Sequence, residues 1–279
     1  MLNHSFVQIP SIGLATEKKF WTGGIGSMDE FIKRPPGYLS VLRQKTISEH
    51  ICLSINKLKA GDAIYFSRNL PPGEHWRIFK EYRNSTAYID IETTGLGGFG
   101  DIITTIALYD GKSVRHYIQG KNLEEFRHDI MEYKVIVTYN GKTFDLPFIE
   151  KYFGISISHA HIDLRYVLRS LGYSGGLKAC ERRLNIGRTG CLEDMDGFFA
   201  VLLWKDYKKN HNDKSLETLL SYNVQDVLSL EYLMVEAYNR KLCDIPLHVD
   251  RLDLPKPPVN PFKADASTIR RIKQQYRID

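Results

Sequence analysis

Four carboxylates and one tyrosine, spread over three short stretches of this 279-residue chain, have the types and spacing that could hold metal ions. Asp90 and Glu92 come first, Asp145 follows, and Tyr222 and Asp226 come last. Asp90 and Glu92 are two residues apart on an expected strand, so both side chains leave the same face of it. Carboxylates placed side by side repel one another unless a cation lies between them. Four converging acidic groups therefore predict a divalent-cation site.

Each part of this pattern also has a simpler structural explanation. An Asp-x-Glu pair is commonly a solvated strand edge, but the apolar residues that precede Asp90 favour a buried strand, where acidic groups need neutralising partners. Asp145 could serve only as the N-cap of the helix that follows it. Tyr222 and Asp226 share one helix face at i and i+4, and such a pair arises by chance in a chain with 16 tyrosines. The order of the parts and the elements that carry them make the whole set more specific than its members.

The elements that must position these residues follow from hydrophobic periodicity and turn signals. They are, in chain order, strands at 88–92, 102–109 and 114–118, a helix at 123–131, a strand at 135–139, a helix at 146–153, and mostly helical sequence over 164–238, most strongly periodic over 216–238. Asp110-Gly111 is a strong hairpin signal between the second and third strands. Asp145 occupies the expected capping position of its helix, and Pro147 lies in the first turn. Strands followed by alternating helix and strand predict an α/β fold, with a mixed sheet that has helices on its faces.

Charge divides the chain into three expected parts. A mostly helical N-terminal region, 1–84, has 12 Lys and Arg against 7 Asp and Glu. The part with the acidic pattern, 85–245, has 19 basic against 22 acidic residues. A Pro-containing linker and basic tail, 246–279 with a helix at 266–276, has 7 basic against 4 acidic residues. An acidic centre with basic flanks suits an enzyme that gathers metal ions and meets a phosphate backbone, although differences this small also arise by chance.

Taken together, the three stretches resemble a known set of motifs. Residues 90–95 read Asp-Ile-Glu-Thr-Thr-Gly, residues 140–145 read Asn-Gly-Lys-Thr-Phe-Asp, and residues 222–226 read Tyr-Asn-Val-Gln-Asp. In this order they resemble the DEDD superfamily of 3′–5′ exonucleases, which has the ribonuclease H-like fold. Ser221 stands where one branch has histidine, so Tyr222 makes the chain similar to the tyrosine branch, DEDDy. Over most of its length the chain resembles the bacterial and archaeal YprB-type ribonuclease H-like family, including at Trp76-Arg77.

The resemblance implies a role for each site residue. It implies two Mg²⁺ or Mn²⁺ ions, and hard oxygen ligands suit these cations rather than Zn²⁺. The implied ligands are four carboxylates, those of Asp90, Glu92, Asp145 and Asp226. Tyr222 completes the catalytic set by orienting the attacking water, because a phenol with a pKa near 10 is a poor base. The expected substrate contacts are Thr93, Thr94, Gly95, Asn140, Phe144 and Asn223.

The function that follows is metal-dependent 3′–5′ hydrolysis of phosphodiester bonds at single-stranded nucleic-acid ends, with DNA favoured over RNA. Two alternatives stay open: a non-cleaving nucleic-acid-binding accessory module, and a ribonuclease H-like endonuclease, which Tyr222 disfavours. The presence of all five expected catalytic residues counts against a module that has lost its activity. The apolar runs are too short to span a bilayer and the start lacks a secretion signal, so we expect a cytoplasmic protein without a membrane partner. Four scattered cysteines are expected to be reduced thiols.

Further patterns suggest other binding sites. Residues 9–25 resemble a helix-hairpin-helix, in which backbone N–H groups bind a DNA phosphate; the alternative is a plain helix capped by Thr16. His159 and His161 could hold a metal on one strand face, but Asp163 is better explained as the cap of the next helix. Six basic residues could follow a substrate strand or form a solvated face: Arg165, Arg169, Lys178, Arg182, Arg183 and Arg188. Four in the tail could meet phosphates: Arg270, Arg271, Lys273 and Arg277.

Overall fold

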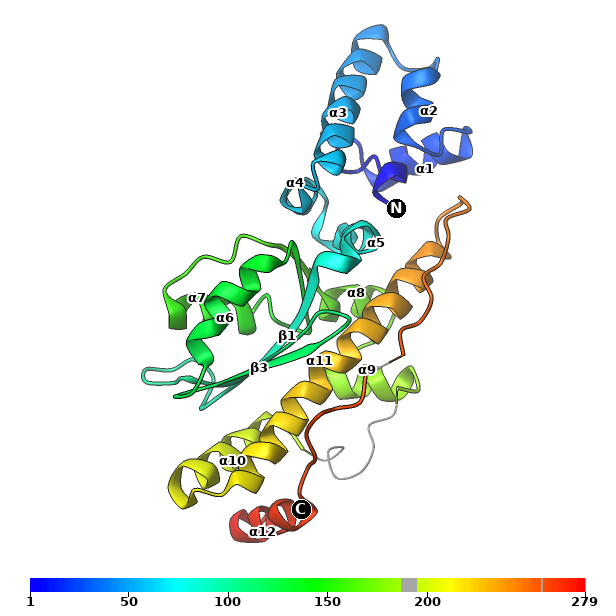
Figure 1. Cartoon of the computed structure of the whole chain (residues 1–279). Coiled ribbons are helices and arrows are strands. Elements are labelled where there is room, and N and C mark those ends of the chain that lie inside the picture. Colours follow the sequence, from blue (N-terminus) through cyan, green and yellow to red (C-terminus); the bar gives the residue numbers. More distant parts are fainter. Residues whose placement is uncertain (187–194, 257, 279) are drawn as a thin grey trace.

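The sheet that carries the acidic pattern has five strands in the order β3-β2-β1-β4-β5, in a computed structural model that describes residues 1–186, 195–256 and 258–278 (Figure 1). The strands are β1 (Thr86–Thr93), β2 (Ile103–Tyr109), β3 (Val114–Ile118), β4 (Val135–Thr138) and β5 (Ala160–Asp163). β1, β2 and β3 pair antiparallel, whereas β4 pairs parallel with both β1 and β5. The mixed sheet confirms the expected fold class, an α/β fold with a helical N-terminal region.

Helices cover both faces of this sheet (Figure 1). Those after β3 are α6 (Phe126–Asp129), α7 (Asp145–Phe153), α8 (Leu164–Ser170), α9 (Leu177–Arg183), α10 (Gly197–Asn210), α11 (Asp213–Leu242) and α12 (Ala266–Tyr276). Successive strand residues point to opposite faces. Ile89 and Ile91 of β1 share a core with side chains of α6 and α7, and Tyr88 shares another with side chains of α11. By this alternation, Asp90 and Glu92 lie on the α11 side of the sheet.

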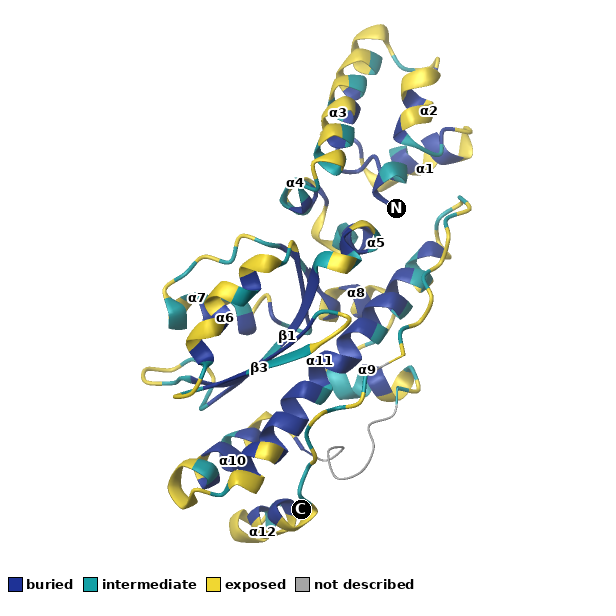
Figure 2. Ribbon diagram, in the orientation of Figure 1, coloured by how far each residue is buried: buried dark blue, intermediate teal, exposed yellow. Residues whose placement is uncertain are grey.

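The longest helix, α11, lies across the sheet and contacts β1 and β2. Its 30 residues begin after Asn212, whose side chain accepts a hydrogen bond from the Lys214 backbone N–H. At 1.5 Å rise per residue the helix is roughly 45 Å long, and buried residues occur along its whole length (Figure 2). Within the described residues, no helix is long and apolar enough to cross a membrane. Because α11 is buried almost all round, its register against β1 is fixed by packing.

The N-terminal region packs into the same core as the sheet. Its helices are α1 (Leu14–Thr22), α2 (Met28–Lys33), α3 (Val41–Lys59), α4 (Ala63–Asn69) and α5 (Phe79–Tyr82), with 3-10 helices at Leu2–His4, Pro72–Ile78 and Arg83–Ser85. Phe6, Phe20 and Phe31 lie in one buried cluster together with Trp76 and Tyr88. The division of the chain at residue 84 stays a prediction, but the apolar contacts run across it.

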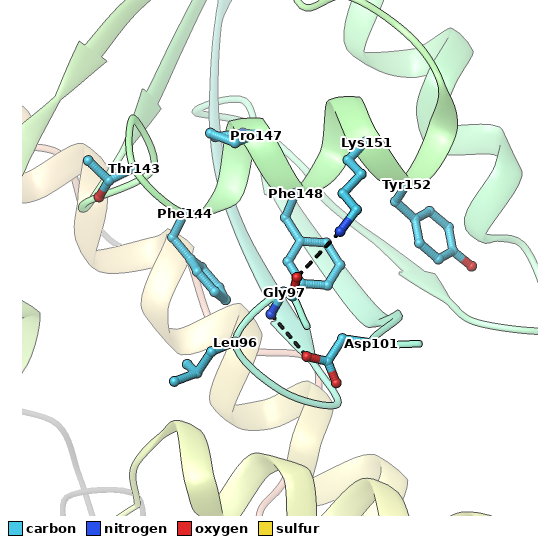
Figure 3. Close-up of a pocket in the computed structure, with 9 residues that line it drawn as sticks. All are labelled: Leu96, Gly97, Asp101, Thr143, Phe144, Pro147, Phe148, Lys151 and Tyr152. Atoms are coloured by element: carbon cyan, nitrogen blue, oxygen red, sulfur yellow. Dashed lines mark hydrogen bonds between the residues drawn. The ribbon is translucent and has the colours of Figure 1, made fainter. Parts of the chain in front are cut away.

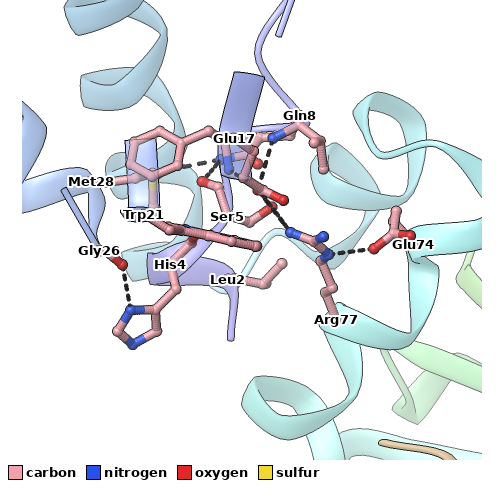
Figure 4. A network of polar contacts seen from close by, with 12 residues as sticks. Leu2, His4, Ser5, Gln8, Glu17, Trp21, Gly26, Met28, Glu74 and Arg77 are labelled. Carbon is pink, nitrogen blue, oxygen red and sulfur yellow. Dashed lines mark hydrogen bonds and ion pairs between the residues drawn. The ribbon is translucent and has the colours of Figure 1, made fainter. Parts of the chain in front are cut away.

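A buried ion-pair network joins the first residues of the chain to the segment that leads into β1 (Figure 4). Arg77, 2% exposed, donates to Glu17 at 2.8 Å and to Glu74 at 2.6 Å. The same Glu17 oxygen accepts the backbone N–H of Phe6 at 2.7 Å, and the Ser5 hydroxyl lies 3.0 Å from Arg77. Charge-assisted hydrogen bonds of this kind satisfy groups that would be costly to bury alone. The network therefore holds the N-terminal segment against the rest of the fold.

The start of α1 differs from the capping alternative given above. Its N-cap is Gly13, without a side-chain cap hydrogen bond, so Thr16 is not the cap. Glu17, in the first turn of α1, is fully buried in the network. Before α1, the described chain has a 3-10 helix at Leu2–His4 and then turns. Phosphate binding by residues 9–25 stays a prediction.

Several expected elements have different bounds. The helix expected at 123–131 is a short α-helix between two 3-10 helices, Leu123–Glu125 and Ile130–Glu132. The helical sequence over 164–238 is divided into α8, α9, α10 and α11, and residues 187–194, with Cys191 and Arg188, lie outside the described residues. Asp145 is the first residue of α7 and Phe144 its N-cap, so Asp145 does not cap its helix as expected.

The C-terminal helix α12 has the expected bounds but packs on the fold. Ile269 and Ile272 lie in a buried cluster with residues of α10 and α11. Arg271 forms an ion pair with Asp206 of α10 at 2.6 Å, so it is not the free phosphate contact that the sequence suggested. The segment before the helix is held as well, because Asn260 donates to the backbone oxygen of Ser221 at 2.8 Å. The tail is thus part of the folded structure.

Replacing Glu17 by Ala is expected to lower the free energy of unfolding by about 3 kcal/mol, because it removes one partner of a buried ion pair. Urea unfolding followed by tryptophan fluorescence measures the change. The matched control is Glu124→Ala, which removes an exposed ion pair with Arg127 and should cost less than about 1 kcal/mol. Equal losses in the two variants would contradict the structural role assigned to Glu17.

Candidate active site

Three of the four predicted carboxylates meet where α11 crosses β1. Oxygen atoms of Asp90, Glu92 and Asp226 all lie within 4.8 Å of one another. Asp90 and Glu92 reach this point because alternate residues of β1 face α11, and Asp226 because α11 packs on that face. Within the described ranges, this is the one group of three or more acidic, histidine or cysteine side chains close enough to share a metal ion. The geometry that the spacing predicted for these three residues is present.

Asp145 lies beside this cluster at the start of α7. Its side chain is 4% exposed, and its Oδ1 accepts the backbone N–H of Ile91 at 3.3 Å. Ile91 stands between Asp90 and Glu92 on β1, so the hydrogen bond places the fourth carboxylate next to the other two. Asp145 is outside the set of oxygens within 4.8 Å of one another.

Burial and mutual repulsion change the acidity of the cluster. Burial, and then the charge of Asp226, raise the pKa of Asp90 and of Glu92 well above their ordinary values. Burial also raises the pKa of Asp145 to about 7. These carboxyls are therefore costly to ionise together without a neutralising charge. The donor set consists of oxygen alone, which fits Mg²⁺ or Mn²⁺ and does not fit a metal that prefers nitrogen or sulfur.

Asn223 orients Asp90 from within the protein. The Asn223 amide donates to Asp90 Oδ2 at 2.7 Å and to the Asp90 backbone oxygen at 3.2 Å. Its oxygen accepts the Thr105 hydroxyl at 3.0 Å, and the residue is 0% exposed. Thr105 pairs with Glu92 across β1 and β2. Asn223, expected as a substrate contact, thus has protein partners at both ends of its amide and positions a carboxylate.

Tyr222 borders the cluster on the side of α9. The ring is 6% exposed, and the Lys178 ammonium lies 5.0 Å from its centroid. Burial raises the pKa of Glu92, and attraction to Lys178 opposes that rise. Tyr222 also lines a cavity of about 780 Å³. Lys178, which the sequence suggested only as part of a basic helical region, is therefore close to the site.

The loop after β1 is shaped by Asp101, which the sequence reading missed. Asp101 accepts the backbone N–H groups of Gly97 and Gly98 at 3.0 and 2.7 Å. A Cβ atom on Gly95 would lie 2.5 Å from its carboxylate, so this position requires glycine. The Thr94 hydroxyl lies 3.3 Å from Asp101. Two of the expected substrate contacts, Thr94 and Gly95, are thereby part of the internal structure of this loop.

Thr93 makes a similar internal contact. Its hydroxyl donates to the backbone oxygen of Gly95 at 2.6 Å, and the residue is buried. The register between β1 and β2 shifts between Glu92 and Thr93, so the strand bulges directly after the second carboxylate. A bulge of this kind bends the strand and redirects the side chains that follow it.

The loop that carries Asn140 is held by Asp163, the last residue of β5. Asp163 accepts the backbone N–H groups of Asn140 at 2.8 Å and Lys142 at 3.0 Å. It also accepts the N–H of Arg165 at 3.0 Å, which confirms the expected helix cap. A Cβ atom on Gly141 would clash with Thr138, so the close turn needs glycine. β4 and β5 pair in parallel, with Thr138 opposite Asp163, so the ends of the two strands bring Asp163 next to this loop.

Phe144 lines a second cavity beside the cluster, of about 340 Å³ (Figure 3). Its ring centroid is 5.8 Å from that of Phe148, and Leu96 from the loop after β1 forms another wall. The Lys151 ammonium donates to the Gly97 backbone oxygen at 3.3 Å and ties α7 to that loop. The structure therefore has one cavity at Phe144, the residue before Asp145, and a separate cavity at Tyr222.

The two histidines of the expected alternative metal site bind separate partners. His161 Nε2 lies 2.9 Å from the Thr138 hydroxyl, whereas His159 Nε2 lies 3.1 Å from the Ile130 backbone oxygen. Burial lowers the pKa of His161 to about 3, so the ring is neutral at physiological pH. Nothing in their described surroundings supports a metal site there.

Without metal, the protein is expected to lose stability as the pH rises from about 6.5 to about 8. The folded pKa values of Asp90, Glu92 and Asp145 are raised, so the folded state keeps protons that the unfolded state has released, and this advantage disappears as these groups ionise. The histidines with lowered pKa values oppose this fall only near the lower end of the range, where the unfolded chain still holds protons on them. Melting temperatures measured in EDTA by circular dichroism test the effect.

Two matched measurements accompany this test. Mn²⁺ should raise the melting temperature most at the higher pH, because the cation then meets ionised carboxylates. The Asp145→Asn variant should show a smaller pH dependence in EDTA than the unmodified protein. A melting temperature in EDTA that does not change over this pH range would contradict the coupled, buried carboxylates.

The match to a family model agrees with the fold of the sheet. The family model described as the RNase H superfamily matches residues 87–238. The protein named uncharacterized protein YprB, from Bacillus subtilis, is 28% identical over 184 residues, which are 58% of this chain and 44% of that protein. The chain therefore spans less than half the length of this relative. Two solved structures are similar at a TM-score of 0.41. Brucella melitensis NrnC bound to pGG is 18% identical over 60% of this chain and 77% of that one. The family B DNA polymerase of Pyrobaculum calidifontis is 17% identical over 57% and 24%. By the family match over more than half of its length, and in agreement with the mixed sheet, this chain belongs to the RNase H superfamily.

Proposed function

We propose that this chain is a metal-dependent 3′–5′ exonuclease that hydrolyses phosphodiester bonds at single-stranded nucleic-acid ends, with DNA favoured over RNA. The observation that carries the proposal is the convergence of Asp90, Glu92 and Asp226, with oxygens within 4.8 Å of one another. Asp145, at the start of α7, adds a fourth carboxylate, because its side chain accepts the backbone N–H of Ile91 between Asp90 and Glu92. Three buried carboxylates and a half-buried one suit a divalent-cation site better than a solvated strand edge.

In this proposal the four carboxylates hold two Mg²⁺ or Mn²⁺ ions. When bound, the ions would acidify the attacking water and stabilise the leaving 3′ oxygen. Asn223 keeps the Asp90 carboxylate turned toward the cluster through its 2.7 Å hydrogen bond. The Ile91 backbone N–H does the same for Asp145. Both contacts fix ligand orientation before any cation binds, as outer partners of metal ligands commonly do.

The remaining residues of the proposed site act on the substrate and on water. Tyr222 is assigned to the attacking water, because it borders both the carboxylates and the cavity beyond them. Phe144 is assigned to a nucleotide base, since its ring forms a wall of the apolar cavity and aromatic faces stack on bases without regard to sequence. Asn140 is assigned to the substrate strand. Residues 85–245 would form the exonuclease domain, between an N-terminal region, 1–84, and the tail, 246–279.

The first test is the product pattern from 5′-labelled DNA and RNA oligomers incubated with Mn²⁺. A ladder of products that shorten from the 3′ end, faster for DNA, is expected, and chelation by EDTA should stop it. Asp226→Asn should remove the activity and keep the fold, because it takes one carboxylate from the cation site. Discrete internal cuts would instead establish the endonuclease alternative, and absence of products would establish the non-cleaving module.

A second test separates Tyr222 from the carboxylates. Tyr222→Phe is expected to lower kcat on the order of 10²-fold while cation and oligomer binding stay unchanged, because only the orientation of water is lost. Calorimetric titration with Mn²⁺ and single-turnover kinetics measure the two properties. A variant as inactive as Asp226→Asn would show that the hydroxyl does more than orient.

A further inference from the structure

A cavity of about 780 Å³, lined in part by Tyr222, shares no described lining residue with the cavity at Phe144. Its walls come from α8, from the loop between α8 and α9, and from the end of β4. The lining residues that matter here are Tyr222, Asn140, Arg165, Arg169 and Tyr173. No acidic side chain lines it among the residues that the structure describes. The charged side chains that line this cavity, among the described residues, are therefore cationic.

Two residues of the cavity wall are close in the chain to residues of the candidate active site. Tyr222 precedes Asn223, which holds Asp90, and its ring forms part of the cavity wall. Asn140 lies in the loop that leads to Asp145 and lines the cavity as well. A chain-like ligand that reaches the carboxylates from this side must therefore pass along the wall formed by Tyr222 and Asn140.

The two arginines on α8 differ in how they are held. Arg165 and Arg169 are at i and i+4, so they lie on the same side of the helix. Arg165 donates to the Asn140 side chain, which fixes its guanidinium at the edge of the site. Arg169 is exposed, and within the described ranges its side chain has no hydrogen-bond or ion-pair partner. The guanidinium of Arg165 is thus positioned by the protein, and that of Arg169 has all of its N–H donors available for a ligand.

Three further cationic side chains lie over the tyrosine rings that line this cavity. Arg183 and Arg240 lie over the Tyr173 ring, at 4.9 and 5.4 Å from its centroid. Lys178 lies over Tyr222. The rings of both tyrosines are therefore contacted by cations, and an anion in the cavity would meet a favourable field from several elements.

We propose that this cavity binds the phosphodiester backbone of a single nucleic-acid strand whose end lies at the carboxylates, with Arg165 and Arg169 as phosphate contacts. The proposal rests on the function proposed above and adds the path of the strand. A planar guanidinium with free donors matches the geometry of a phosphate. The acidic cluster repels a polyanion, so affinity for the strand must come from cations placed beyond it. Because DNA and RNA carry the same phosphates, these two arginine contacts are expected with either strand, and a preference for DNA would come from other contacts.

The test is binding of a 5′-fluorescein-labelled dT12 oligomer to the full chain, followed by fluorescence anisotropy over a range of salt concentrations. Ca²⁺ replaces Mg²⁺ or Mn²⁺, because it fills oxygen sites with a looser geometry. Arg169→Gln is expected to weaken binding about 5-fold at 0.1 M salt and to reduce the log–log salt slope by about 0.7, the value for one phosphate contact on a single strand. Arg169→Lys should restore most of the slope, and an rU12 oligomer should show the same loss.

The matched control is Arg127→Gln, an equal change of charge on α6, which covers the opposite face of the sheet. It should leave both affinity and slope unchanged. The proposal is overturned if the unmodified protein does not bind dT12, if Arg169→Gln keeps the full slope, or if Arg127→Gln loses as much. Incubation of the same oligomer with Mn²⁺ separates this result from the proposed function. If binding depends on Arg169 but no cleavage occurs, the proposed nuclease function is contradicted and the proposed strand path is supported. If cleavage occurs but the salt slope of Arg169→Gln is unchanged, the strand path is contradicted and the nuclease function is supported.

Discussion

The packing of α11 across β1 is the constraint on which the candidate site depends, because it brings like charges together in a buried place. Asp90 and Glu92 on the strand meet Asp226 on the helix, and burial with mutual repulsion raises the pKa values of the two strand residues. Such a cluster opposes the contact that forms it. Apolar packing along the 30 residues of α11 offsets the repulsion, and Asn223 supplies one of the few neutral donors to it. The fold tolerates this repulsion between carboxylates because α11 is buried along almost its whole length.

Two aspartates outside the motifs shape the loops on either side of the cluster. Asp101 gathers backbone N–H groups of the glycine-rich loop after β1, and Asp163 gathers those of the loop that carries Asn140. Hydrogen bonds from several N–H groups to one carboxylate are stronger than neutral ones and fix the turn of the chain. The shape of the cavities beside the site therefore depends on residues that do not themselves meet the proposed cations.

The N-terminal region supports the same site from further away. Arg77 lies in the 3-10 helix before β1 and is fixed by Glu17 and Glu74. Two residues earlier, His75 lies 3.2 Å from the His161 backbone oxygen, on the strand that ends at Asp163. A continuous set of contacts thus leads from the first residues of the chain to the loop of Asn140. We infer that the N-terminal region is a structural part of the fold as well as a basic flank.

The sequence by itself determined the strand around Asp90 and Glu92 and the bounds of β3 and α12, because local periodicity and side-chain alternation are properties of neighbouring residues. That Asp226 belongs with Asp90 and Glu92 was expected from the order of the motifs and their resemblance to a known set. Tertiary structure decided which of these residues line a cavity and which are held by other parts of the protein. Asn223 turned out to hold a carboxylate, Asp145 to accept a strand N–H, and Arg271 to pair with Asp206, since each contact joins positions far apart in the chain. Sequence spacing carries no information on such partners, because they are set by how helices pack on the sheet.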